Sequence, residues 1–193
     1  MASREEICNI ALAYLGQSPI SSFDDDGTDA AMYCRALFTH ARDATLRMHP
    51  WNFATKRVEL AVSAAAPECE YDYAFPLPSD YLKRQQLFGA DDTTTEVTDY
   101  RIEYGSILTN EDALFLRYTA AVEEDGRFDT VFVMAIAAQL AMQLAYPITG
   151  KTTQMQAMQQ LLDYWLSQAK IADKNESAWE IKNSSTWDTA RGE

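Results

Sequence analysis

The sequence predicts an α+β fold in which a bundle of about four helices carries an inserted small antiparallel β module and an extended C-terminal arm. Apolar residues recur at helical spacing before residue 50 and again after residue 129. Between them lie short segments rich in Val, Ile, Tyr and Phe, separated by turn residues, and the chain becomes polar beyond Ile171. We therefore divide the chain into a helical hairpin over 1–50, a β module over 51–120, two further bundle helices over 121–175 and an arm over 176–193.

Capping signals set the limits of the first two helices. Ser3 and Glu6 form a capping box, and Gly16 can take the left-handed position that ends a helix, so the first helix is expected to run from Arg4 to Leu15. A second helix follows the acidic loop over 18–28. It should end at His49, because Pro50 lacks an N–H and disfavours helical geometry in the residue before it. We expect these two helices to pair.

The residue pattern predicts strands in the middle of the chain and helices in the later part. A hairpin is expected to turn at Gly105 and Ser106. The helix after Asp129 is apolar on most sides, and Pro147 and Gly150 should end it. Six residues of the last helix share a coiled-coil seam: Met155, Met158, Leu162, Trp165, Ala169 and Ala172. The expected strands cover 53–62, 71–75, 81–88, 100–104, 106–108 and 113–118.

Charge and cysteine content restrict the class of function. The formal net charge of -13 comes from 29 acidic and 16 basic residues, which disfavours a free-standing duplex-binding protein but suits a pore through which DNA slides. Cys8, Cys34 and Cys69 cannot all pair, which indicates a reducing compartment. The N-terminus lacks a secretory signal, so we expect the chain to be made in a cytoplasm. The apolar run over 131–148 is mostly alanine, so no membrane span is expected.

Motifs that suggest chemistry have simpler interpretations. The segment over 145–152 fits a relaxed phosphate-loop pattern, but it follows a helix where a strand is needed. The run over 24–29 resembles the start of a calcium loop, yet Tyr33 stands where the bidentate glutamate must be. His40 and His49 lack a metal-binding cluster, and we interpret both as structural. A glycosidase-like carboxylate pair is defined by the distance between its two carboxyl groups in space. The spacing of acidic residues along the sequence does not give that distance, so this hypothesis stays open. We predict no catalytic residue, no metal and no cofactor.

Large aromatic residues are the candidates for contacts. Trp51 and Phe53 anchor the corner after Pro50 and, with Trp165, are predicted to be subunit-interface or core anchors. Trp179 and Ile181 lie two apart, so in an extended arm they point the same way, which suits strand addition to a neighbouring chain's sheet. Together with Trp187 they are the predicted partner-binding residues. The alternative is a tail whose aromatic residues fold back on the parent domain.

Taken in order, several segments resemble one family, the head-to-tail adaptors or tail tubular A proteins of short-tailed bacteriophages. The resemblance covers residues 3 to 175, and the tail after Asn175 is where it fades. The segments are Cys8-Asn-Ile-Ala-Leu-Ala-Tyr-Leu-Gly-Gln, Pro19-Ile-Ser-Ser-Phe-Asp-Asp, His49-Pro-Trp-Asn-Phe-Ala, Phe75-Pro-Leu-Pro-Ser-Asp-Tyr-Leu, Leu116-Arg-Tyr-Thr-Ala-Ala-Val and Phe128-Asp before the alanine-rich helix.

The resemblance implies a structural connector protein at the head–tail junction of a virion, assembled in the host bacterial cytoplasm. It implies a dodecameric ring that binds the portal protein, continues the DNA channel without specific DNA binding, and offers a platform to the tail nozzle protein. The residues leave two other hypotheses open. One is a tail-associated enzyme that degrades peptidoglycan with a carboxylate pair, and the other is an acidic DNA mimic that blocks host nucleases.

Overall fold

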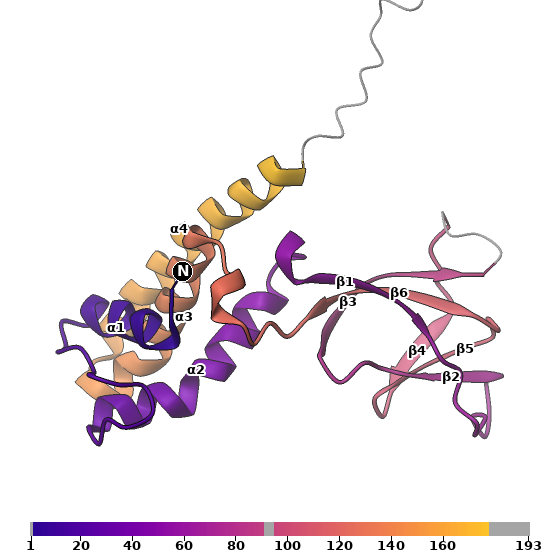
Figure 1. The fold of residues 1–193 in the computed structure, drawn as a ribbon, viewed down its shortest axis with the longest axis horizontal. Helices are drawn as coiled ribbons and strands as arrows, with labels where there is room; N and C mark the ends of the chain where they lie inside the picture. Colours follow the sequence, from indigo (N-terminus) through magenta and orange to yellow (C-terminus); the bar gives the residue numbers. More distant parts are fainter. Residues whose placement is uncertain (1, 91–94, 178–193) are drawn as a thin grey trace, which may run out of the picture.

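A helical body and a β module lie end to end in the computed structural model, which describes residues 2–90 and 95–177 (Figure 1). The α+β fold is confirmed. The helical body consists of α1 (Arg4–Tyr14), α2 (Asp29–Arg47), α3 (Thr130–Thr149) and α4 (Thr152–Ser177). The β module lies between α2 and α3 in the sequence and consists of β1 (Thr55–Leu60), β2 (Tyr73–Pro76), β3 (Tyr81–Gly89), β4 (Tyr100–Glu103), β5 (Ser106–Thr109) and β6 (Leu114–Ala120).

The capping signals in the sequence are used as expected in α1, whereas α2 is shorter than predicted. The Ser3 hydroxyl accepts a hydrogen bond from the Glu6 N–H at 3.1 Å, and Gly16 has a φ of 68°. Helix α2 ends at Arg47, two residues before the predicted end at His49. Since His49 precedes Pro50, helical geometry is disfavoured at His49 itself, and the chain leaves the helix earlier.

Helix α3 is the centre of the helical body. The Asp129 carboxylate caps its first turn, and eleven of its 20 residues are buried, five of them alanines that let neighbouring helices approach closely. Both α1 and α2 pack mainly against α3, so the expected pairing of the first two helices is a minor contact. By length and composition α3 would be long enough to cross a membrane, but 61% of its most apolar window is buried within the protein.

The β module contains two small antiparallel sheets of three strands each. Their strand orders are β1-β6-β3 and β2-β5-β4. One cluster of buried side chains from both sheets fills the space between them, including Leu60, Phe75, Leu87, Ile107, Leu114 and Leu116. Strand β1 begins two residues later than predicted, because Asn52–Ala54 form a 3-10 turn first. The β4–β5 hairpin turns at Tyr104 and Gly105, one residue earlier than predicted, because Ser106 already pairs with Glu103. The φ angles of 45° and 74° are those of a tight hairpin turn.

Candidate functional site

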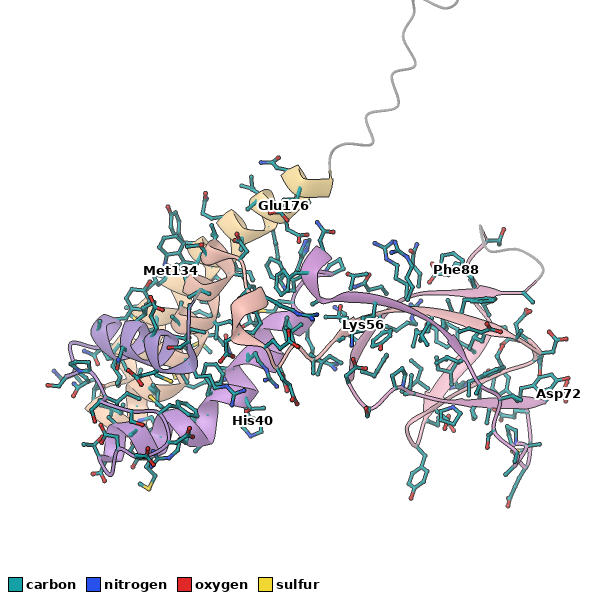
Figure 2. The ribbon with its side chains drawn as sticks, in the orientation of Figure 1. His40, Lys56, Asp72, Phe88, Met134 and Glu176 are labelled. Atoms are coloured by element: carbon teal, nitrogen blue, oxygen red, sulfur yellow. The ribbon has the colours of Figure 1, made fainter. Side chains whose placement is uncertain are left out.

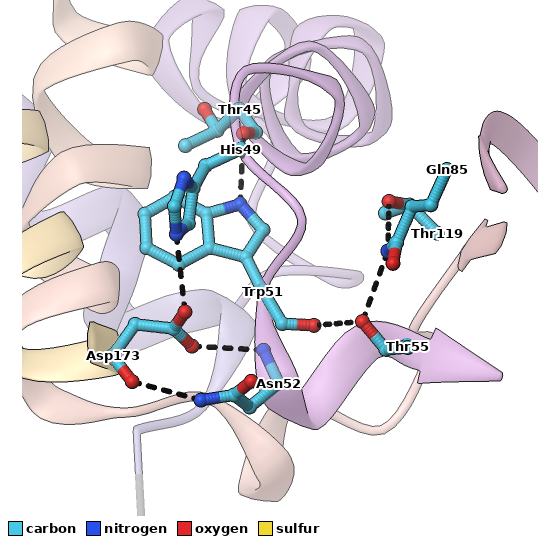
Figure 3. A network of polar contacts seen from close by, with 8 residues as sticks. All are labelled: Thr45, His49, Trp51, Asn52, Thr55, Gln85, Thr119 and Asp173. Atoms are coloured by element: carbon cyan, nitrogen blue, oxygen red, sulfur yellow. Dashed lines mark hydrogen bonds and ion pairs between the residues drawn. The ribbon is translucent and has the colours of Figure 1, made fainter. Parts of the chain in front are cut away.

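A buried carboxylate joins the helical body to the start of the β module. Asp173 on α4 is only 9% exposed. Its Oδ1 accepts a hydrogen bond from the Asn52 backbone N–H at 2.8 Å, and its Oδ2 lies 3.0 Å from His49 Nε2 (Figure 3). The Asn52 amide donates in turn to the Asp173 carbonyl at 2.8 Å. The corner after α2 is therefore held to the last helix by three polar contacts.

A second set of hydrogen bonds continues from this corner into the sheet. The Trp51 indole N–H donates to the Thr45 carbonyl at 3.2 Å, and the Trp51 carbonyl accepts from the Thr55 hydroxyl at 2.7 Å. The Gln85 amide then donates to the hydroxyls of Thr55 and Thr119 at 2.9 and 3.0 Å (Figure 3). This network links α2 to all three strands of the first sheet, so the β module is held in a fixed orientation.

The predicted anchors Trp51 and Phe53 pack against other residues of the same molecule. Trp51 is 1% exposed, and its ring centroid lies 4.7 Å from that of Phe132 on α3. Phe53 is half-buried, 4.9 Å from Phe132 and 6.1 Å from Trp51. Both residues therefore act as core anchors at the junction.

Trp165, the third predicted anchor, lies half-buried on α4 with its ring 5.1 Å from that of Tyr164. Of the predicted coiled-coil seam, Leu162 and Ala169 are buried, while Met155 at the start of the helix is exposed. The partner-binding predictions Trp179, Ile181 and Trp187 lie outside the described residues.

The outer face of α4 exposes large apolar side chains. Tyr164 and Ile171, seven residues apart and so on one face of the helix, are each 54% exposed. They point away from the buried stripe that contains Leu162 and Ala169. These two side chains, with the polar Ser167 and Gln168 between them, offer a small apolar patch for contact with another chain.

The motifs that suggest chemistry take structural roles in the described part of the chain. The segment over 145–152 ends α3 and begins α4, so no strand precedes it. Backbone N–H groups of Ser21 and Thr28 hold the pKa of Asp26 well below its usual range, and this carboxylate orders the loop before α2. Within residues 2–90 and 95–177, no group of three or more His, Cys, Asp or Glu side chains could hold a metal ion.

The two buried cysteines belong to the helical core. Cys8 and Cys34 are both fully buried, whereas Cys69 is exposed. The hydrogen bond with Cys34, together with burial, raises the pKa of the Cys8 thiol far above its usual range. A thiol in that state is a poor nucleophile, so its role is packing.

Sequence reasoning missed Asp173, although a signal was present. Asp173 follows Leu162 and Ala169 at helical spacing and so belongs to the buried stripe of α4. A carboxylate on a buried stripe requires polar partners, which here are Asn52 and His49.

No model of a known protein family matches this chain, and no curated protein matches it either.

Proposed function

We propose that this chain is a structural head-to-tail adaptor of a bacteriophage virion. It forms a ring below the portal protein, continues the DNA channel and gives the tail nozzle protein its platform. The proposal comes from the resemblance of the sequence segments to the adaptor family. The exposed apolar face of α4 is the observation in the structure that supports it best.

A ring needs a surface on each flank that a neighbouring copy can cover. Helix α4 has 26 residues and is therefore about 39 Å long. It lies at the outside of the helical body in Figure 1, with Tyr164 and Ile171 on its exposed face. A neighbouring helix packed along it would contribute to the more than ~1,000 Å² that a stable interface buries.

The hydrogen-bonded junction between the helical body and the β module suits a connector that must keep these two bodies in a constant orientation. Asp173, His49 and Asn52 fix the β module to the helical body. One body can then contact neighbouring copies while the other faces the next tail component. The excess of acidic residues suits a channel along which DNA moves without adhering.

The test is the binding of the chain to the portal of the same phage, with α4 altered. The variant Tyr164→Asp/Ile171→Asp should lose ring formation on the portal, because two charges would have to be buried between copies. The matched control is Thr152→Asp/Gln156→Asp, which adds the same charge to an adjacent exposed face of α4 and should assemble as wild type does. Equal assembly of both variants would contradict the role given to this face.

A further inference from the structure

An arginine pair lies on the outer face of the sheet β1-β6-β3. Arg57 on β1 stands directly opposite Arg117 on β6. The side-chain Oε1 of Gln86 accepts a hydrogen bond from Arg117 Nη1 at 3.1 Å. In the described part of the chain no carboxylate forms an ion pair with either arginine, and Arg117 Nε is buried without an acceptor. Like charges opposite each other in a sheet are destabilising, so this face is suited to receive anionic groups.

The arginine pair lines a hollow that also contains apolar surface. The hollow has a volume of about 480 Å³, and Phe88 and Phe115 form part of its wall. Both phenylalanines are half-buried and belong to neither core cluster. We call the group Arg57, Gln86, Phe88, Phe115 and Arg117 the arginine socket. Figure 2 shows Phe88 on the β module, far from His40 on the helical body.

Other basic side chains of this sheet already have partners. Lys56 pairs with Asp80, and Arg84 pairs with Glu96. Lys83 Nζ donates to a carbonyl at the end of α2 at 3.0 Å. The charge available to an outside ligand is therefore concentrated in the socket.

A complementary surface lies on the loop between α1 and α2 and on the first turn of α2. Asp24, Asp25 and Asp29 are exposed there, and no described cation forms an ion pair with them. One helical turn further on, Met32 is 52% exposed. We call these four residues the acidic knob. Its carboxylates suit arginines and its methionine suits an aromatic wall.

The acidic knob is held in shape before any partner binds. Arg35 Nη1 donates to the backbone carbonyls of Phe23 at 2.8 Å and Asp26 at 3.0 Å, and so leaves the neighbouring carboxylates unused. The Asp26 carboxylate accepts from the N–H groups of Ser21 and Thr28 at 2.9 and 2.8 Å. A loop ordered in advance loses little entropy on binding.

The knob lies on the helical body and the socket lies on the strands of the β module (Figure 1). One copy cannot join its own two surfaces. We propose that the arginine socket of one copy receives the acidic knob of a second copy. The contact joins two different surfaces, as the heterologous interfaces of rings do. This inference rests on the proposed function, because it names one contact between neighbouring copies of the adaptor.

A second protein copy fits this face better than a nucleic acid does. Single-strand binding surfaces track the backbone with a continuous basic groove. Here two arginines are available, Glu59 is exposed beside them on the same face, and the chain as a whole has a charge of -13.

Sedimentation equilibrium of the full chain at low ionic strength tests the contact. The wild-type chain should self-associate weakly, and salt should reverse the association. Arg57→Glu should weaken the association by about tenfold or more, and so should Asp25→Arg/Asp29→Arg. Mixing the two variants should restore association between them, since opposite charges meet again. Arg57 is exposed on β1, so its substitution leaves the core intact.

Two control variants sharpen the result. Arg101→Glu changes the same charge on β4 of the other sheet, where the side chain is also exposed, and should associate as wild type does. Glu59→Gln removes a negative charge beside the socket and should tighten the association.

Four results would overturn the contact. The first two are a wild-type chain that stays monomeric and equal effects of Arg57→Glu and Arg101→Glu on association. The third is a mixture of Arg57→Glu with Asp25→Arg/Asp29→Arg that does not associate. The fourth is association that is lost only when 178–193 are deleted. Binding of a single-stranded oligonucleotide that Arg57→Glu abolishes would identify a nucleic-acid surface and would also overturn the contact.

If wild type and Arg57→Glu both form rings on the portal, the contact is wrong and the adaptor function stands. If wild type forms no ring there, the adaptor function is wrong whatever the socket binds.

Discussion

Replacing Asp173 by alanine should destabilise the whole chain, because this carboxylate joins α4 to the corner after α2. The substitution removes the acceptor of the Asn52 N–H at 2.8 Å and the partner of His49 Nε2 at 3.0 Å. A hydrogen bond to a charged group contributes about 1.5–3 kcal/mol, and both of these bonds are only partly shielded from solvent. With two groups affected, we expect a loss of roughly 3 kcal/mol in the free energy of unfolding, which is about 6–12 °C in Tm for a chain of this length.

The assay is urea unfolding followed by far-UV circular dichroism, with Asp163→Ala as the matched control on the same helix. Asp163 is exposed and accepts one hydrogen bond, from Gln159 at 3.2 Å. Its loss should cost about 0.5 kcal/mol or less. Asp173→Asn should fall between the two, since it keeps an oxygen that can accept from the Asn52 N–H.

Amide hydrogen exchange distinguishes the junction from a general loss of stability. In Asp173→Ala the Asn52 amide should lose protection by more than amides in the centre of α3 do. Unfolding free energies of Asp173→Ala and Asp163→Ala that agree within about 0.5 kcal/mol would refute the role given to Asp173.

Three further predictions concern the two cores and a turn. Burial, with the hydrogen bond to Asp80, raises the pKa of Tyr118 from 10.0 to about 12. Its contribution to stability is therefore complete below pH 10 and is lost as the pH rises through 12, and unfolding of Tyr118→Phe should depend less on pH over that interval. Gly105→Ala should lose about 1 kcal/mol in thermal unfolding because φ is 74°, whereas Gly27→Ala, with open space around its Cα, should lose almost nothing. Trp51→Ala should lose about 3–5 kcal/mol in urea unfolding, and a loss below about 1 kcal/mol would contradict its place in the core.

Local signals in the sequence were enough to predict where most elements begin and end. Ser3 caps α1, Gly16 takes the left-handed conformation after it, and Asp129 caps α3. Each of these signals acts within a few residues of itself, so each can be read without knowledge of the fold. The early end of α2 also has a local cause, because proline restricts the residue before it. Helix α3, in contrast, continues through Pro147 to Thr149, so only Gly150 ends it as predicted.

Features that depend on strand pairing could not be predicted from the sequence. Strand β1 pairs with β6 across most of the module, and the division into two sheets follows from such distant pairings. The opposition of Arg57 and Arg117 depends on that register, so the arginine socket has no signature along the chain. The contact of His49 with Asp173 likewise joins residues 124 positions apart in the sequence.

Electron microscopy of the purified chain, alone and mixed with the portal protein of the same phage, tests the proposed function most directly. A subunit with a net charge of -13 repels copies of itself, so the free chain should associate no further than a small, weakly held oligomer. On the portal it should form a closed ring, expected to contain twelve copies. Stable rings of the free chain would contradict the dependence on the portal, and the absence of any ring on the portal would contradict the adaptor function itself.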